Sequence, residues 1–283
     1  MASSPVFSNI PLTLVTSDNV SLPVYCLSVS LIGDVETRNI RACPKDFTLH
    51  RWFGGRVYFS GLVQANATTG ALPDNISYIT LSSGQKLYEC RLISAGTGVS
   101  GISSRGFISV SMGYSFLTYS SASSAGLAGT DGTHLTSTTA HTAEDSSSLL
   151  PSAGSRGYIK IGSSRIAGLH LKRCTIEYEY KKYAKPSFPT VLPVYDGSSM
   201  TVSGMSTRPS MLMHIGEYGS ITHVLPSSSS GNILEEGISN AILYKQSASV
   251  VSNGQINLID VEYGFKGSLK NAGAGSNQGE WYY

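Results

Sequence analysis

The stretch FTLHRWFGGRVYFSGLVQANATTGALPDNISYIT, residues 47–80, decides the fold class, because it alternates as a strand does and then turns. From Trp52 onward, alternate apolar residues beginning with Phe53 are expected on one side of a sheet. Gly54 and Gly55 remove side-chain bulk from this run, which in a strand indicates a bulge, a bend or the close approach of another backbone. We therefore predict a curved β-hairpin with its turn in the Asn-Ala-Thr-Thr-Gly segment.

Strand-type alternation recurs along the rest of the chain. Apolar side chains alternate with small ones from Ile108 to Phe116, and with mostly polar ones over residues 175–180 and 259–265. Helix-type spacing is weak. Its one candidate is Asn232–Gln246, where aliphatic residues could form a stripe, although Gly237 would cost about 1 kcal/mol there. The chain is therefore predicted to be mainly β, with at most one short helix.

Composition limits the classes of function. The 283 residues suffice for one large β domain or two smaller ones, and only 13% of them are charged, against about 25% in average soluble domains. A low-charge, hydroxyl-rich chain suits a protein whose surface is covered by neighbours, or an extracellular β-sandwich. The net charge of +2 is too small to predict nucleic-acid binding through bulk electrostatics.

The sequence carries no signal for secretion or membrane insertion. Its first residues contain no basic segment followed by a continuous apolar one, so no signal peptide is expected. No apolar run approaches the roughly 20 residues that a membrane-spanning helix needs, so no membrane partner is expected. The four cysteines are far apart in the sequence, and free buried thiols are favoured over disulfides.

No catalytic, cofactor-binding or metal-binding site is predicted. The six histidines lie in none of the spacings that zinc sites use. The sequence also contains no G-x-S-x-G nucleophile elbow and no glycine-rich phosphate loop. We therefore expect a protein that is not an enzyme and that needs no cofactor.

A basic cluster flanks a tyrosine-rich segment. Basic residues among aromatic ones can contact RNA, and they could equally contact a neighbouring subunit; the members are Lys172, Arg173, Lys181 and Lys182. The alternative is an ordinary half-buried strand, in which Ile176, Tyr178 and Tyr180 face inward and the charged residues between them form cross-strand pairs. Both interpretations place this segment in a sheet.

The opening stretch resembles the third and fourth strands of the jelly-roll capsid proteins of picornaviruses and picorna-like insect viruses. That family has a W-x-G-G-like opening, an alternating apolar run and an A-T-G type of turn. The residues in these places here include Trp52, Gly54, Gly55 and Gly70. Later segments, Gly106–Ser121, Gly157–Ile161 and Cys174–Pro189, resemble further strands of the same fold, although Met112-Gly113-Tyr114 stands where the family commonly has a proline before an aromatic.

The resemblance implies an all-β, eight-stranded antiparallel jelly-roll sandwich with a C-terminal β-rich extension. It divides the chain into an N-terminal arm at 1–19, a shell domain at 20–190, and an extension or projecting subdomain at 191–283. The Pro-rich segment Lys185–Pro193 favours the second boundary.

The same resemblance implies a function. It points to a structural protein of an icosahedral virion, assembled in the host cytoplasm with related jelly-roll subunits, with genomic RNA inside and an unidentified host receptor outside. The missing myristoylation signal and Asp-Asp-Phe motif point to an insect, Nora-virus-like source. The alternative is a carbohydrate- or receptor-binding β-sandwich of a fibre or a secreted protein.

Overall fold

A computed structural model of the chain describes thirteen segments, and Gly70 of the predicted capsid signature lies outside them. The described residues are 9–40, 47–64, 75–98, 106–120, 157–161, 164–166, 169–184, 191–206, 212–213, 215–216, 218–225, 234–252 and 257–269.

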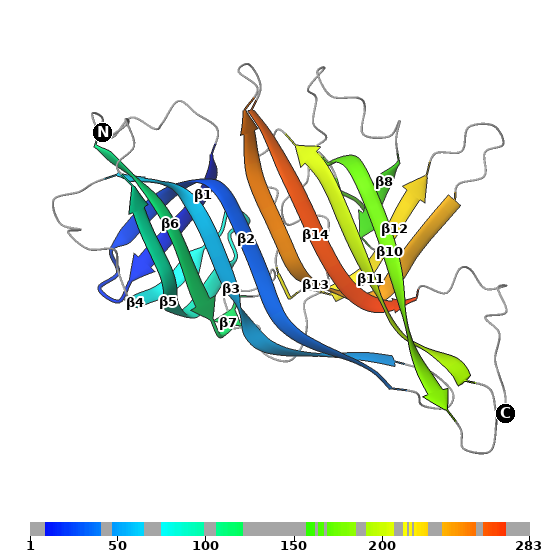
Figure 1. Ribbon diagram of the computed structural model, residues 1–283. Helices are drawn as coiled ribbons and strands as arrows, with labels where there is room; N and C mark the ends of the chain where they lie inside the picture. Colours follow the sequence, from blue (N-terminus) through cyan, green and yellow to red (C-terminus); the bar gives the residue numbers. More distant parts are fainter. Residues whose placement is uncertain are drawn as a thin grey trace.

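All regular secondary structure in the described residues is β, which confirms the all-β part of the predicted fold. The strands pair antiparallel throughout and form one continuous sheet (Figure 1). Their bounds are β1 Ile10–Thr16, β2 Ser21–Ile40, β3 Phe47–Gln64, β4 Asn75–Thr80, β5 Lys86–Gly98, β6 Phe107–Phe116, β7 Thr118–Tyr119, β8 Tyr158–Ile161, β9 Ser164–Arg165, β10 His170–Ala184, β11 Val191–Ser206, β12 Tyr218–Leu225, β13 Leu234–Ser252 and β14 Asn257–Leu269.

The helix candidate at Asn232–Gln246 is wrong, because residues 234–246 belong to the long strand β13. The register of β13 against β14 shifts twice, after Ser239 and after Leu243, and the consecutive residues Ala241, Ile242 and Leu243 are all buried. Such irregularities change the phase of the two-residue alternation. Consecutive buried residues then imitate a helical stripe in the sequence.

The first six strands close into a ring, which we call the first unit. Each pairs with two others of the six, so that the order β1-β4-β5-β6-β3-β2 returns to β1. The predicted hairpin between β3 and β4 is wrong, because β3 pairs with β2 and β6 whereas β4 pairs with β1 and β5. The two strands follow one another in the chain but are not neighbours in the sheet, which is a Greek-key connection.

The remaining long strands repeat this order and form the second unit. The order β8-β12-β13-β14-β11-β10 again places the first, fourth, fifth, sixth, third and second strands side by side. The short strands β7 and β9 attach to β5 and β8. Within the described residues no pairing joins β8 to β10, so the second unit is open where the first is closed. The units join where β2 pairs with β13.

The predicted division at residues 19–20 and 190–191 stays a prediction, and strand pairing crosses both positions. β1 pairs with β2 across the first position, and β10 pairs with β11 across the second. The repeated strand order instead divides the chain between β7 and β8.

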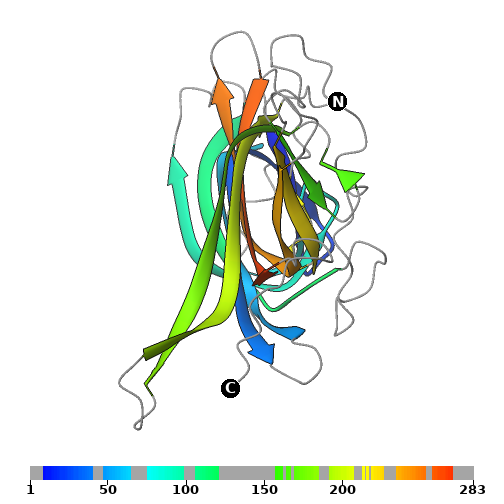
Figure 2. The same cartoon turned by 90° about the vertical axis from the view of Figure 1, so that its right-hand side faces the viewer.

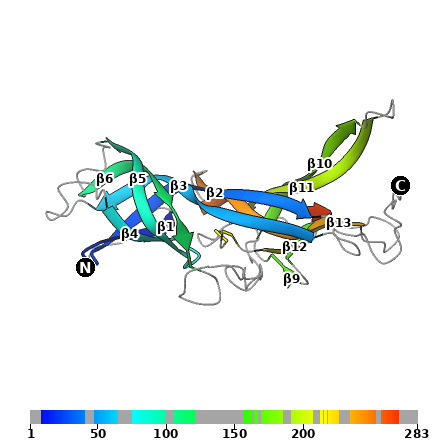
Figure 3. The same cartoon turned by 90° about the horizontal axis from the view of Figure 1, so that it is seen from below.

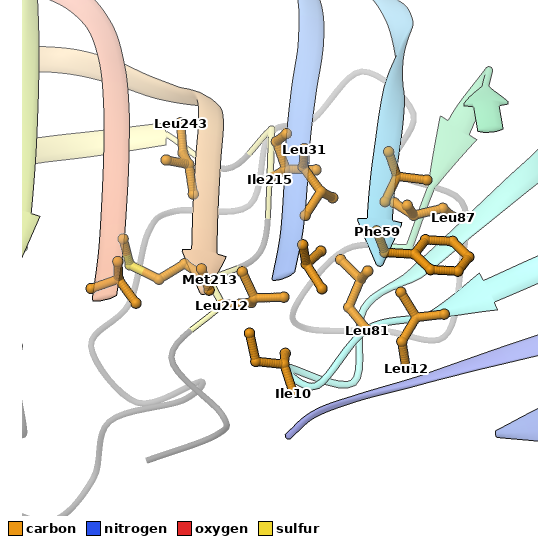
Figure 4. Close-up of a cluster of buried hydrophobic side chains, with 14 of the residues drawn as sticks. Ile10, Leu12, Leu31, Phe59, Leu81, Leu87, Leu212, Met213, Ile215 and Leu243 are labelled. Carbon is orange, nitrogen blue, oxygen red and sulfur yellow. The ribbon is translucent and has the colours of Figure 1, made fainter. Parts of the chain in front are cut away.

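One hydrophobic core extends through both units (Figure 4). Where the units meet, the segment between β11 and β12 enters this core between side chains of the first unit, such as Leu31 and Leu81, and Leu243 of the second. We call this segment the buried strap; its described residues are Leu212, Met213, Ile215 and Gly216.

Two fully buried glutamines hold the strap. Gln85, between β4 and β5, accepts a hydrogen bond from the Ile215 N–H at 2.8 Å and donates to the carbonyls of Ile215 at 2.9 Å and Ser120 at 3.2 Å. Gln246, on β13, accepts from the Met213 N–H at 2.9 Å and donates to the Met213 carbonyl at 2.7 Å. Each unit therefore supplies one amide side chain that satisfies the strap backbone as a neighbouring strand would.

A bulge on β3 changes the predicted orientation of the residues before Gly54. Phe53, predicted to face the same side as Val57, is 51% exposed, whereas Trp52 packs edge-on against Tyr119 with ring centroids 4.7 Å apart. The register between β2 and β3 shifts here, and Gly54 has a φ of 100°. The extra residue reverses the alternation on the N-terminal side of the bulge. The sequence had indicated an irregularity at the glycines but not its effect on Phe53.

Candidate interaction surfaces

Two hairpins continue beyond the body of the sheet as two-stranded ribbons (Figures 1 and 3). In the first unit, residues 35–40 of β2 pair only with residues 47–52 of β3. In the second unit, residues 179–184 of β10 pair with residues 191–197 of β11, beyond the last pair that joins β11 to β14. The ribbons occupy the same place in the repeat, since each connects the second strand of a unit to the third.

The first ribbon lies against the second unit, and we call it the docked ribbon. His50 Nε2 hydrogen-bonds to the carbonyl of Asn240 on β13, and His50 Nδ1 is 3.1 Å from Thr37 Oγ1. Burial lowers the pKa of His50, an effect that the Asn240 hydrogen bond opposes. The ring is therefore neutral near pH 7, where its Nε2–H donates to the carbonyl and its Nδ1 accepts from Thr37.

The second ribbon projects away from the body, and we call it the free ribbon (Figures 2 and 3). No third strand pairs with it among the described residues. Tyr178, predicted to face inward, lies at its base and is 44% exposed, because β14 no longer accompanies β11 beyond Ser198. Ile176 still packs against the core, as predicted. An isolated two-stranded hairpin is marginally stable in water, so this ribbon is suited to packing against another molecule.

The structure separates the predicted basic cluster into two pairs. Lys172 and Arg173 lie on the body of the sheet, where Lys172 forms an ion pair with Asp260 and Arg173 Nε donates to Thr175 Oγ1 at 3.1 Å. These side chains are exposed, so such contacts contribute little to stability. They do, however, leave less unpaired positive charge for RNA than the sequence suggested.

Lys181 and Lys182 lie on the free ribbon. Their cross-strand partners are Val194 and Pro193, and the acidic residue Glu179 lies opposite Gly197. None of these directly opposed residues is charged, so the register places no opposite charges across from Glu179, Lys181 or Lys182. Lysine and proline on a two-stranded ribbon instead oppose indiscriminate pairing with other strands.

One outer face of the sheet crosses both units. Directly paired residues point to the same side of a sheet, so the register aligns side chains in rows across eight strands. One row reads Ser94, Gly113, Tyr58, Ser30, Ser247, Glu262, Ser203 and Arg173, from β5 to β10. In the adjacent row, Ser28 and Ser60 share a hydrogen bond of 2.8 Å. We call this hydroxyl-rich surface the serine face.

Two strand edges of the body have no partner among the described residues. One edge of β5 pairs with β6, while the other pairs with β4 only as far as Arg91, which leaves Leu92–Gly98 open on that side. Residues 93–97 are all exposed, and Ile93 is 46% exposed. β10 likewise pairs with β11 alone. Both edges present backbone donors and acceptors to a further strand.

The described cysteines show no reactive thiol. Cys26, Cys90 and Cys174 are free, and the first two are buried, as predicted; Cys43 lies outside the described residues. Burial raises the pKa of the Cys90 and Cys174 thiols to about 12. They are therefore protonated near neutral pH and are weak nucleophiles.

The described residues contain no group of three or more His, Cys, Asp or Glu side chains that could hold a metal ion. They also contain no helix long and apolar enough to cross a membrane.

No protein-family model and no curated protein sequence matches the chain. The ribbons, the open edges and the serine face are therefore the features that can indicate a function.

Proposed function

We propose that the chain is a structural capsid protein that forms the icosahedral shell of a picorna-like RNA virus together with related subunits. The observation that carries the proposal is the free ribbon. Its counterpart in the first unit is docked on the second unit through His50 and Asn240, whereas no further strand of the described residues pairs with the free ribbon. A neighbouring subunit can supply the surface that this ribbon lacks.

The serine face and the composition support the same proposal. Burying a broad face with few unpaired charges in an interface costs little desolvation free energy, because few charges lose their contact with water. The ion pair between Lys245 and Glu262, at 2.9 Å, already neutralises part of it. In a closed shell each weak contact is repeated many times, and multiplicity makes the assembly stable.

The jelly-roll interpretation belongs to this proposal and rests on the resemblance around Trp52. The strand pairing supports the coarser statement, an antiparallel β protein with Greek-key connections, and leaves an eight-stranded jelly roll as a prediction. Assembly in the host cytoplasm and recognition of a receptor are proposed on the same resemblance.

Electron microscopy of the purified full chain tests the proposal, with closed virus-sized shells as the expected result. Replacing residues 179–197 with Asn-Gly, a favoured two-residue hairpin turn, removes the free ribbon and leaves the body strands intact. Because no third strand of the described residues pairs with this ribbon, we expect the free energy of unfolding to change by less than about 1 kcal/mol. The shells are expected to disappear.

Other results for the full chain and for the variant without residues 179–197 would contradict these expectations. A full chain that stays monomeric or trimeric at every concentration contradicts the capsid proposal. Shells that persist without residues 179–197 show instead that the free ribbon is not the contact on which assembly depends.

A second prediction concerns RNA. If Lys181 and Lys182 of the free ribbon contact the genome, the double substitution Lys181→Glu and Lys182→Glu removes two phosphate-binding charges and introduces two repulsive ones. We expect particles with reduced RNA content, measured by the ratio of absorbance at 260 and 280 nm. Unchanged RNA content and particle yield would remove these lysines from the proposal.

A further inference from the structure

We infer that copies of this chain associate head to tail, with β10 of one copy pairing antiparallel with the open edge of β5 in the next. The inference rests on the proposed assembly function and names the partner and the surface, since the partner is a second copy and the acceptor is the edge from Leu92 to Gly98. The contact would make the sheet continuous from one copy to the next.

The internal junction of the chain is the precedent. There β2, the second strand of the first unit, pairs with β13, the fifth strand of the second unit. In the repeat, β10 corresponds to β2 and β5 corresponds to β13. The junction inside the chain therefore uses one second-strand edge and one fifth-strand edge. The remaining edge of each kind, on β10 and on β5, has no partner in the part of the chain that the structure describes.

The fifth strands of the two units, β5 and β13, have the same arrangement of partners along their edges. One edge of β13 pairs with β14, and the other pairs first with β12, as far as Ile242, and then with β2 from Lys245 to Ser249. β5 has the same division, with β6 on one edge and β4 on the first part of the other. The second part of that edge has no partner among the described residues. It occupies the position at which β13 receives β2.

The register of the contact follows from the repeat. The acceptor strands of the two units are aligned through the sixth strands, β6 and β14. The pairing of β6 with β3 ends at Phe116, and the equivalent pairing of β14 with β11 ends at Gly267. Three residues before these positions lie Gly113 and Gly264, whose partners on the fifth strands are Ser94 and Lys245. The segment Lys245–Ser249 of β13 thus corresponds to Ser94–Gly98 of β5.

The donor strand aligns in the same way. The first residues of β3 and β11 in those pairings are Gly55 and Ser198, and their partners on the second strands are Gly33 and Tyr178. The segment Ser28–Ile32 of β2 therefore corresponds to Arg173–Glu177 of β10.

Combining the two alignments defines the opposing residues between copies. Inside the chain, Lys245 lies opposite Ile32 and Ser249 lies opposite Ser28. The equivalent contact between copies places Ser94 opposite Glu177 and Gly98 opposite Arg173. No like charges oppose each other in this register. The small residues of the β5 edge also offer no bulky side chain against the incoming strand.

The physical gain comes mainly from the backbone. An open edge leaves a row of N–H and C=O groups without strand partners, and an added strand satisfies them while side chains set the register. Because the donor and acceptor surfaces differ, the contact is heterologous, and it generates a ring if the rotation closes and an open filament if it does not.

A charge exchange at the predicted register tests the inference with the full chain. Ser94 and Glu177 are both exposed, so substitutions there should leave the fold intact. At low salt, Ser94→Glu should weaken self-association about twofold to fivefold per contact, and Ser94→Lys should strengthen it by a similar factor. Adding Glu177→Lys to Ser94→Glu should restore association. The control is Ser17→Glu, at an exposed turn position, which should have no effect.

Sedimentation velocity measures the association, and electron microscopy of the same samples shows the products. Equal association of the Ser94→Glu and Ser94→Lys variants, or no rescue by Glu177→Lys, overturns the inference, even if closed shells form and the proposed function stands. Charge-dependent association that yields only filaments or open rings supports the inference and contradicts the capsid function. A chain that never associates overturns both.

Discussion

Gln85→Leu is expected to lower the free energy of unfolding by about 3–5 kcal/mol, one of the largest effects of any single substitution in this chain. Leucine fills the same space, so little room remains for a replacement water. It leaves three buried backbone groups without partners, the N–H and C=O of Ile215 and the C=O of Ser120. Each such group costs about 1–3 kcal/mol when its partner is removed. Equilibrium unfolding in urea measures the change.

A matched control is Gln64→Leu, at a half-buried position near the end of β3, which should change stability by no more than about 0.5 kcal/mol. A loss below about 1 kcal/mol for Gln85→Leu would show that the strap backbone finds other partners.

The second strap glutamine provides a test of coupling. Gln246→Leu should also destabilise, because it removes both hydrogen bonds to the Met213 backbone. Once one glutamine is lost the strap can leave the core, so the double variant should be less destabilised than the sum of the single variants. Additive losses would mean that Gln85 and Gln246 hold the strap independently.

The sequence predicted the fold class because a β-strand leaves a local signature. Val57 and Phe59 are buried, and Tyr58 between them is 37% exposed, as a period of two requires. The same reasoning failed where the pattern loses phase. At Phe53 and around Ile242, bulges reversed or compressed the alternation, and bulge geometry depends on the opposing strand as much as on the residues themselves.

Local sequence patterns could not predict which strands are neighbours in the sheet. The turn-like segment between β3 and β4 suggested a hairpin, but a turn signal does not say to which strand the chain returns. Both strands instead pair with others, such as β6 and β1, that lie elsewhere in the sequence. The repeated strand order could not be predicted from the sequence either, because the two units share a topology but have no obvious sequence motif in common.

The candidate surfaces show the same limit. The lysines of the free ribbon were found from composition, because charges among tyrosines stand out. The open edge of β5 was missed, since Gly96-Thr97-Gly98 reads as a flexible turn and an open edge is defined by a strand that is absent. Gln85 gave no signal either, because its strap partner Ile215 is 130 positions away.

Gly54→Ala is the second substitution with a large expected effect, a loss of about 3–5 kcal/mol in the free energy of unfolding. Two costs add at this position. The φ of 100° is one that residues with a Cβ rarely adopt, and an added Cβ would lie 2.5 Å from the Phe116 carbonyl oxygen on β6. That oxygen belongs to the backbone of a paired strand, so it cannot move aside without separating β3 from β6.

Two further glycines separate these costs when they are measured in the same urea unfolding series. Gly84 has a φ of 84° with nothing within 4 Å of an added Cβ, so Gly84→Ala should cost only the backbone strain, about 1 kcal/mol. Gly96 lacks a positive φ, and its nearest neighbouring atom would be 3.7 Å away, so Gly96→Ala should be neutral or stabilising by up to about 1 kcal/mol. Equal losses for Gly54→Ala and Gly84→Ala would mean that the contact with Phe116 contributes nothing. The bulge that turns Trp52 toward the core would then depend on backbone conformation alone.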